Sequence, residues 1–217
     1  MGSKRLPGKV MKKIGNKLII EYIIEKLSKI KGLEKTIIST SKNSEDDKIA
    51  NFCKKKNILF YRGSVNNVAK RLLDTAKTNK LDAFIRISGD SPLLLQSIIK
   101  KGINLYKNND YDIVTNVFPR SFPKGQSIEI INLQVLKKTI HKMSCKQDKE
   151  HVTTYFYKNN NKYKIFNFLN KKKLDLINLS IDTIDDLKMI KLIISDINKK
   201  NLNHSLKNYI DAYKKYE

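Results

Sequence analysis

The sequence lacks tryptophan, has only two cysteines in 217 residues and contains no long apolar run. Without about 18 consecutive apolar residues we expect no transmembrane helix, and the polar first residues lack the apolar region of a signal peptide. Cys53 and Cys145 lie far apart, in lysine-rich surroundings and without metal-ligand spacing. We therefore expect reduced thiols in a cytoplasmic protein.

Acidic residues are scarce: 21 Asp and Glu stand against 44 Lys and Arg, a formal net charge of +23. Arginine occurs only at positions 5, 62, 71, 86 and 120, so 39 of the 44 basic residues are lysine. Arginine is the residue preferred for bidentate phosphate and base contacts. Lysine, asparagine and isoleucine share A/T-rich codons, and the lysines are spread along the chain, so genome composition accounts for the charge. We expect no specific nucleic-acid partner, only a general attraction for anionic substrates.

Hydrophobic residues make up 40% of the chain, enough for one sizeable core, and we predict a single domain over residues 1–217. Apolar periodicity alternates between helix and strand up to residue 116. The predicted strands are 34–40, 58–61, 81–88 and 111–116, and the predicted helices are 16–32, 44–57, 66–79 and 92–109. Ser44 is the expected N-cap of the second helix, and Pro92 is expected in the first turn of the fourth. This rhythm is typical of a doubly wound, mostly parallel α/β sheet with helices on both faces.

The alternation breaks at residues 117–131, where FPRSFPKGQSIEII places two prolines and a glycine before an alternating strand. This segment is too apolar and too long for a plain loop. We predict an antiparallel excursion or a dimer arm, and a homodimer. Beyond it, the patterns predict helices at 132–142 and 150–160, strands at 163–169 and 176–182, and helices at 184–199 and 204–215.

Two predicted strands lead into carboxylates, and in a doubly wound sheet the ligand binds at the carboxyl ends of the strands. Asp90 follows AFIRISG, and Asp182 ends LINLSID, with Asp185 and Asp186 just beyond. Two carboxylates from separate strand ends can hold one Mg²⁺ together with substrate phosphates, and the loop GSKRLPGK offers N–H groups and cations for those phosphates. An ordinary structural role fits equally: Asp90 as a helix cap, and the later aspartates as helix N-terminal charge.

Other strand ends and helices carry further polar residues. Gly63 and Ser64 end the second predicted strand, and Asn116 ends the fourth. Arg71 is compatible with a surface salt bridge, and His151 with an ordinary half-exposed helix position. No single residue is decisive, and the order and spacing of the whole set carry the argument.

Six segments occur in the order found in one enzyme family: MGSKRLPGKV, YRGSVNNVAKRL, RISGDSPLL, FPKGQSIEII, EHVTTYFYKNNNKYKI and LSIDTIDDL. Through them, nearly the whole chain resembles the cytidylyltransferases that make CMP-activated acidic sugars. The similarity is strongest to the SpsF-like spore-coat polysaccharide branch, related to CMP-KDO and acylneuraminate synthetases. It implies a Rossmann-like nucleotidyltransferase fold, CTP and an acidic 2-keto sugar as substrates, Mg²⁺ as cofactor, and CMP-sugar and pyrophosphate as products.

The resemblance also assigns roles to individual positions. Ser3, Arg5 and Lys9 match residues that hold the triphosphate, and Asp90 and Asp182 match the metal-binding carboxylates. The expected nucleotide side also includes Gly63, Ser64, Arg71 and Gly89, and the expected sugar side includes Asn116, Glu129, Glu150 and His151. Arg5, Lys9 and Asp90 are the expected catalytic residues, because nucleotidyl transfer depends on positioning and charge stabilisation.

The chain departs from the family pattern at Ser127, where the SpsF-like branch tends to have Asp, and at Asn66 and Asn67 in an often acidic stretch. The change at Ser127 bears on the sugar site, and the set of changes reflects either drift or a different sugar. Three alternatives stay open: a nucleotide-sugar glycosyltransferase of similar fold, an inactive truncated homologue, and a basic nucleic-acid-binding protein. The Ser/Arg/Lys loop favours nucleotidyl transfer because it serves a triphosphate.

A phosphate-binding loop of this kind normally follows a buried central strand, and no strand pattern precedes Ser3. We expect a strand of about 5–6 residues to be encoded ahead of Met1, ending in an arginine as in the family. Its buried side chains would contribute roughly 6–12 kcal/mol, comparable to the whole stability of a domain. Without it, the chain is expected to be poorly soluble or inactive.

Overall fold

The structure is a computed structural model that describes residues 3 and 5–217, so positions 1, 2 and 4 of the predicted loop lie outside the described residues. The strands are β1 (Lys13–Ile14), β2 (Lys17–Leu18), β3 (Ile38–Ser41), β4 (Phe60–Gly63), β5 (Ala83–Arg86), β6 (Ile113–Thr115), β7 (Glu129–Asn132) and β8 (Ile165–Asn167). The helices are α1 (Ile19–Ser28), α2 (Asp47–Lys55), α3 (Val68–Thr78), α4 (Gln96–Lys107), α5 (Leu133–Thr139), α6 (Lys146–His151), α7 (Thr154–Lys158), α8 (Ile184–Lys199) and α9 (Leu206–Tyr216). Short 3-10 helices span Lys9–Met11, Ser44–Asp46, Ile140–Lys142 and Asn160–Lys162.

Four strands form one mixed sheet in the order β5–β7–β6–β8. Strand β7 runs antiparallel to both β5 and β6, and β6 runs parallel to β8. Strands β3 and β4 form a separate parallel pair, and β1 and β2 form a short hairpin. The predicted α/β class with an antiparallel part is confirmed, and the antiparallel strand lies inside the sheet.

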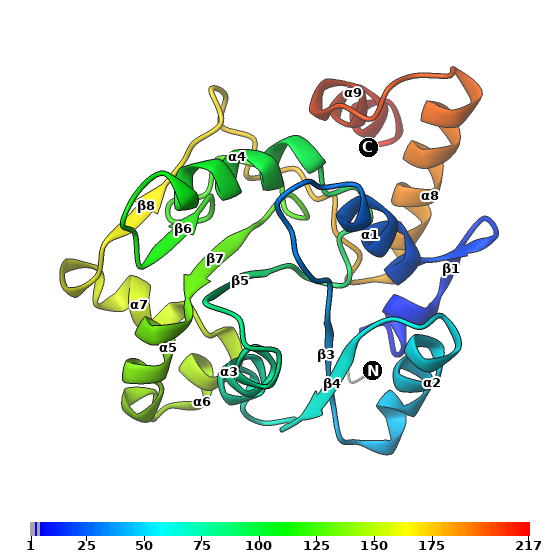
Figure 1. Cartoon of the computed structure of the whole chain (residues 1–217). Helices are drawn as coiled ribbons and strands as arrows, with labels where there is room; N and C mark the ends of the chain where they lie inside the picture. Colours follow the sequence, from blue (N-terminus) through cyan, green and yellow to red (C-terminus); the bar gives the residue numbers. More distant parts are fainter. Residues whose placement is uncertain (1–2, 4) are drawn as a thin grey trace.

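Side chains alternate between the two faces of the four-stranded sheet. Val114 and Ile130 pack with α4 in one buried cluster, which α1, α8 and α9 complete, whereas Ile113 and Ile131 pack with α3, α5 and α7 in another. Figure 1 shows α4 on one side of the sheet and α3, α5 and α7 on the other. Helix α4 approaches closely at Gly102, because a Cβ there would overlap a side chain at the sheet.

Two predicted elements are wrong. Residues 176–182 form no strand; they make an isolated bridge between Lys124 and Asn178, and their other backbone bonds reach loops. The predicted helix 150–160 is broken at Val152, whose φ of 51° ends α6 before α7 begins. Asp182 therefore follows an extended loop segment instead of ending a strand.

The helix starts also differ from the sequence prediction. Ser44 begins a 3-10 helix instead of capping α2, and Asp46 accepts a bond at 2.8 Å from Thr40 Oγ1. Pro92 lies in the segment before α4, which begins at Gln96. Gly15, with φ 58°, sits in the turn of the β1–β2 hairpin, which the apolar periodicity did not reveal.

Strand β3 pairs with β4 and β5 pairs with β7 among the described residues, so each has one edge without a strand partner there. The expected strand ahead of the first loop stays a prediction. Both cysteines are free thiols, Cys53 buried and Cys145 exposed. Within residues 3 and 5–217, no helix combines the length and apolar character needed to cross a membrane.

Candidate active site

The first loop folds onto its own backbone and is anchored in the core. The N–H of Leu6 donates to Ser3 Oγ at 3.3 Å, and the N–H of Lys9 donates to the Leu6 carbonyl at 3.2 Å. Leu6 is buried, which fixes the turn against the core. Gly8 takes φ 66°, a conformation that favours glycine, and so starts the 3-10 helix that carries Lys9.

Lys9 joins the two predicted metal-binding carboxylates. Its Nζ donates to Asp90 Oδ2 at 2.5 Å and to Asp182 Oδ1 at 2.8 Å. The Lys9 and Asp90 side chains are only 17% and 16% exposed. Arg5 approaches from the solvent side, with its Nη2 at 3.1 Å from Asp182 Oδ2. The structure therefore brings together four residues from three distant parts of the chain.

Electrostatics in this cluster follow from burial and pairing. Burial lowers the pKa of Lys9, but the hydrogen bonds and charges of Asp182 and Asp90 outweigh it, so the pKa of Lys9 is raised overall. Burial raises the pKa of Asp182, but Lys9 and Arg5 hold that pKa below its usual range. Pairing thus favours the charged forms of both Lys9 and Asp182 over their neutral forms.

Backbone contacts hold the two carboxylates close to each other. Asp90 lies in the loop between β5 and α4, and its carbonyl accepts a bond from the N–H of Ile181 at 2.9 Å. Gly89 lies against the first loop, because a Cβ there would meet Val10 Cγ1 at 3.2 Å. Asp182 follows Ile181 directly, so the main chain places it beside Asp90.

The structure separates the three neighbouring aspartates. Asp186 closes the capping box of α8 and accepts from the N–H groups of Asp182 and Thr183 at 2.9 and 2.7 Å. Asp185 is 82% exposed and pairs with Lys188 at 2.9 Å. Of the three, only Asp182 contacts Lys9, so it is the candidate ligand, and the helix-terminal role belongs to Asp186.

The donor chemistry at Lys9 fits Mg²⁺. Both carboxylate oxygens lie within 2.8 Å of one nitrogen, so they converge on one cationic position. Among the described residues there is no group of three or more His, Cys, Asp or Glu that could hold a metal ion. Mg²⁺ usually takes one or two carboxylates and completes its octahedron with phosphate oxygens and waters. Asp90 and Asp182 would therefore hold Mg²⁺ together with a phosphate group.

The predicted nucleotide residues near β4 also come together. Arg71 of α3 donates from Nη1 to the Ser64 carbonyl at 2.8 Å, and a Cβ on Gly63 would meet Arg71 Cγ at 2.7 Å. Burial lowers the pKa of Arg71, and its Nε is buried without a hydrogen-bond partner among the described residues. Arg71 therefore bonds the backbone of the β4–α3 loop, where the sequence also allowed a surface salt bridge.

The predicted sugar residue Glu129 starts β7 and is buried. Its Oε2 binds Arg86 Nη1, and its Oε1 accepts from Thr153 Oγ1 at 2.5 Å and from Tyr157 Oη at 2.8 Å. Burial and the Glu129 charge raise the pKa of Tyr157. Asn116 braces a loop, donating to the Gln126 carbonyl at 2.7 Å. Both residues stand at the predicted end of the sheet, with their polar atoms bonded within the protein.

The other two predicted sugar residues lie on α6. Glu150 and His151 are exposed and close that helix, directly before the positive φ of Val152. Thr153, the next residue, carries the hydroxyl that binds Glu129. The break at Val152 thus connects the exposed pair to the buried network.

Sequence reasoning missed four residues of this region: Arg86, Arg120, Thr153 and Tyr157. Arg120 donates from Nη1 to Ser127 Oγ at 2.8 Å, and burial lowers its pKa while Glu129 raises it. A signal existed for Arg86, because one arginine ends the otherwise apolar stretch AFIR. No pattern marked Thr153 or Tyr157, since their role depends on how α6 and α7 fold back onto β7.

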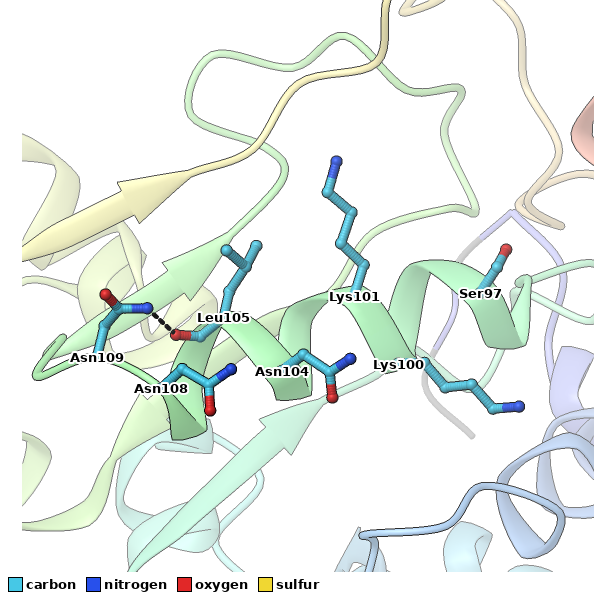
Figure 2. Close-up of a pocket in the computed structure, with 7 residues that line it drawn as sticks. All are labelled: Ser97, Lys100, Lys101, Asn104, Leu105, Asn108 and Asn109. Atoms are coloured by element: carbon cyan, nitrogen blue, oxygen red, sulfur yellow. Dashed lines mark hydrogen bonds between the residues drawn. The ribbon is translucent and has the colours of Figure 1, made fainter.

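A separate hollow of about 540 Å³ lies along α4. Figure 2 shows its lining, which is Ser97, Lys100, Lys101, Asn104, Leu105, Asn108 and Asn109. The dashed bond joins the Asn109 amide to the Leu105 carbonyl at 2.9 Å. None of the predicted site residues lines this hollow, so the candidate site stays at the first loop.

The chain is similar to known proteins over its whole length. A family model described as cytidylyltransferase matches residues 1–215. The solved structure of a cytidylyltransferase from Leptospira borgpetersenii serovar Hardjo-bovis (strain JB197) is 33% identical, with a TM-score of 0.89, and the match covers 99% of this chain and 89% of that one.

Two sequence relatives have informative names. Spore coat polysaccharide biosynthesis protein SpsF of Bacillus subtilis (strain 168) is 27% identical over 204 residues, which are 89% of this chain and 82% of the relative. The 3-deoxy-manno-octulosonate cytidylyltransferase 2 of Hydrogenovibrio crunogenus is 32% identical over 141 residues, 63% of this chain and 55% of the relative.

Proposed function

The chain belongs to the cytidylyltransferase family of nucleotidyltransferases, and on this premise we propose that it transfers the CMP group of CTP to an acidic sugar. The resemblance drawn from the six sequence segments is confirmed at the level of the family. One relative is named for spore coat polysaccharide and another for an octulosonate, a sugar acid. The first name supports a role in making a surface polysaccharide, and the second supports a CMP-activated sugar acid as the product.

One observation carries the proposal: Lys9 binds both Asp90 and Asp182, with Arg5 beside them. Two cationic side chains can bind the phosphate oxygens of a triphosphate, and two carboxylates can share a divalent ion with it. These are the two requirements of nucleotidyl transfer, which depends on positioning and on stabilising charge. A sugar-nucleotide diphosphate would need fewer cations.

In the proposed reaction, the anomeric hydroxyl oxygen of the sugar forms a bond to the α-phosphorus of CTP. The bond from that phosphorus to the bridging oxygen breaks, pyrophosphate leaves, and the hydroxyl proton is released to solvent. Bound Mg²⁺ would polarise the phosphate oxygens. Lys9 and Arg5 would bind the triphosphate and stabilise the charge that develops on the leaving pyrophosphate.

The sugar side supports an anionic acceptor. Arg86 and Arg120 both lie near Glu129, so this region holds two guanidinium groups around one buried carboxylate. Ser127 is the neutral partner of Arg120, which leaves the charge of that arginine uncompensated by this contact. A guanidinium group binds a carboxylate in bidentate fashion, so a sugar acid is the expected acceptor.

A pyrophosphate-release assay tests the proposal. The purified protein is incubated with Mg²⁺, each of CTP, ATP, GTP and UTP, and a panel of 2-keto sugar acids beside their neutral sugar analogues. We expect release with CTP and an acid, and none with the neutral analogue. Release with no member of the panel, together with hydrolysis of a nucleotide-sugar, would replace the proposal by glycosyl transfer. Equal use of all four nucleotides would show that the site recognises only phosphate.

A further inference from the structure

The carboxylate pair and Lys9 form a closed cluster. Lys9 Nζ lies 2.5 Å from Asp90 Oδ2 and 2.8 Å from Asp182 Oδ1, so the ammonium stands between the two side chains. Arg5 binds the other oxygen of Asp182 at 3.1 Å. Of the four carboxylate oxygens in the pair, three thus contact a cationic side chain of the first loop.

An ammonium group and a divalent cation both bind to these carboxylate oxygens. A lysine ammonium has three protons to donate and no acceptor atom, and Mg²⁺ needs oxygen ligands at about 2.0–2.1 Å. Both would occupy the position between Asp90 Oδ2 and Asp182 Oδ1, and two cations repel at such short range. The arrangement in the structure and a metal-bound arrangement therefore exclude each other.

We propose that Lys9 and the divalent cation compete for Asp90 and Asp182, so that the pair accepts a cation only when a triphosphate draws Lys9 away. This rests on the proposed function, because it takes the metal and the triphosphate from there. Lys9 then has two alternative partners, the carboxylate pair and the phosphates. Metal and nucleotide bind together, and the cation alone binds weakly.

The loop is suited to this exchange. Lys9 begins a 3-10 helix directly after Gly8, whose left-handed φ of 66° makes a sharp turn, so the lysine stem starts at a fixed point. Arg5 is 66% exposed and therefore faces the side from which a solute arrives. A triphosphate that binds Arg5 first brings several negative charges next to Lys9 and provides it with new acceptors.

The test measures Mn²⁺ binding by water-proton relaxation, which reports protein-bound Mn²⁺ without any turnover. The proteins are the wild type, Lys9→Gln, Lys9→Arg and Lys13→Gln. Lys13 is an exposed residue of β1, so its substitution removes the same charge away from the carboxylates. Each protein is titrated with Mn²⁺ alone and with Mn²⁺ plus CTP, and its folding is checked by circular dichroism.

We expect Lys9→Gln to bind Mn²⁺ alone at least about 10-fold more tightly than the wild type, with Lys9→Arg and Lys13→Gln within about twofold of it. Equal Mn²⁺ affinity of Lys9→Gln and Lys13→Gln would overturn the competition. Should Lys9→Gln not fold, Lys9→Met is titrated in its place, and Mn²⁺ affinity equal to that of Lys13→Gln would again overturn the proposal.

The same titration separates this inference from the proposed function. Wild-type protein with CTP is compared with Asp182→Asn and CTP. If the wild type with CTP binds no more Mn²⁺ than Asp182→Asn with CTP does, the assignment of the metal site is wrong. The proposed function would then have no metal site at Asp90 and Asp182. If CTP increases Mn²⁺ binding to the wild type, but Lys9→Gln binds Mn²⁺ alone no more tightly than the wild type does, only the competition is wrong.

Discussion

The N–H of Ile181 donates to the carbonyl oxygen of Asp90 at 2.9 Å, and this bond joins the two chain segments that carry the candidate metal ligands. Ile181 is fully buried, so its neighbour Asp182 is held at a fixed place beside Asp90. Backbone packing therefore determines the spacing of the two carboxylates. Neutral substitutions of these side chains should change charge and leave the fold in place.

Gly63 controls the position of Arg71, because a Cβ there would come within 2.7 Å of Arg71 Cγ. We expect Gly63→Ala to displace Arg71 and to weaken CTP binding about 10-fold, measured by calorimetry. Arg71→Met should weaken it similarly, and the double variant should lose no more than either single one, because both act through one guanidinium. Additive losses in the double variant would show that Gly63 acts independently of Arg71.

Glu129 neutralises Arg86 inside the protein, and its side chain is 7% exposed while that of Arg86 is 33% exposed. Glu129→Gln leaves a partly buried guanidinium without its counter-charge, and we expect a loss of about 2–3 kcal/mol in urea unfolding. Glu25→Gln is the matched control, because its ion pair with Lys17 is about half exposed, and it should cost less than about 1 kcal/mol. Similar losses for both variants would show that the Glu129 network contributes no more than a surface pair.

Lys26 gives a pH dependence of stability. Its Nζ is buried without a hydrogen-bond partner among the described residues, and burial lowers its pKa to about 8. A folded pKa below the unfolded value of 10.5 means that the charged form is disfavoured in the folded protein. This lowers the free energy of unfolding by about 3 kcal/mol below pH 8, and the loss disappears as the pH rises towards 10.5.

Lys26→Met should therefore stabilise the protein at pH 7 by up to about 3 kcal/mol, with the gain vanishing near pH 10.5. Urea unfolding at several pH values measures this. Lys29→Met, at an exposed position just after α1, serves as the control and should change stability by less than about 0.5 kcal/mol at any pH. A pH-independent difference between Lys26→Met and the wild type would contradict the assignment.

The predicted homodimer has a candidate surface next to the 117–131 segment. Leu169 and Leu176 are 53% and 92% exposed, and the loop between them is tied to that segment by the bond from Leu174 N–H to the Ser121 carbonyl at 2.9 Å. We expect a dimer mass by light scattering, and a monomer mass for Leu176→Asp but not for Leu202→Asp, a partly exposed leucine elsewhere. A monomeric wild type at working concentration would refute the dimer.

Local patterns predicted much of the fold. The helices at 184–199 and 204–215 have strong apolar periodicity and their own capping residues, Thr183 and Ser205, so the chain near each one determines it. The convergence of Asp90 and Asp182 was also predictable, because both follow apolar segments that must enter one core. The hairpin at Gly15 had a usable signal in its Gly-Asn turn.

The rest depends on partners far away in the sequence. Residues 176–182 look like a strand, but their backbone bonds go to Lys124 and Asp90 in loops, and apolar alternation does not reveal the partner. The break at Val152 needs a positive φ at a β-branched residue, which local propensity argues against. Only the packing of α6 on α3 and of Phe156 in the core accounts for it.

CMP transfer at the Lys9, Asp90 and Asp182 cluster can be followed by label transfer from CTP. CTP labelled at the α-phosphate is incubated with Mg²⁺ and the acid selected by the pyrophosphate assay. We expect one labelled CMP-sugar for each pyrophosphate released, a rate at least about 100-fold lower in Asp90→Asn and Asp182→Asn, and a rate within about twofold of wild type in Asp185→Asn. Label recovered as free CMP or CDP, or wild-type rates in both Asp90→Asn and Asp182→Asn, would contradict CMP transfer at this cluster.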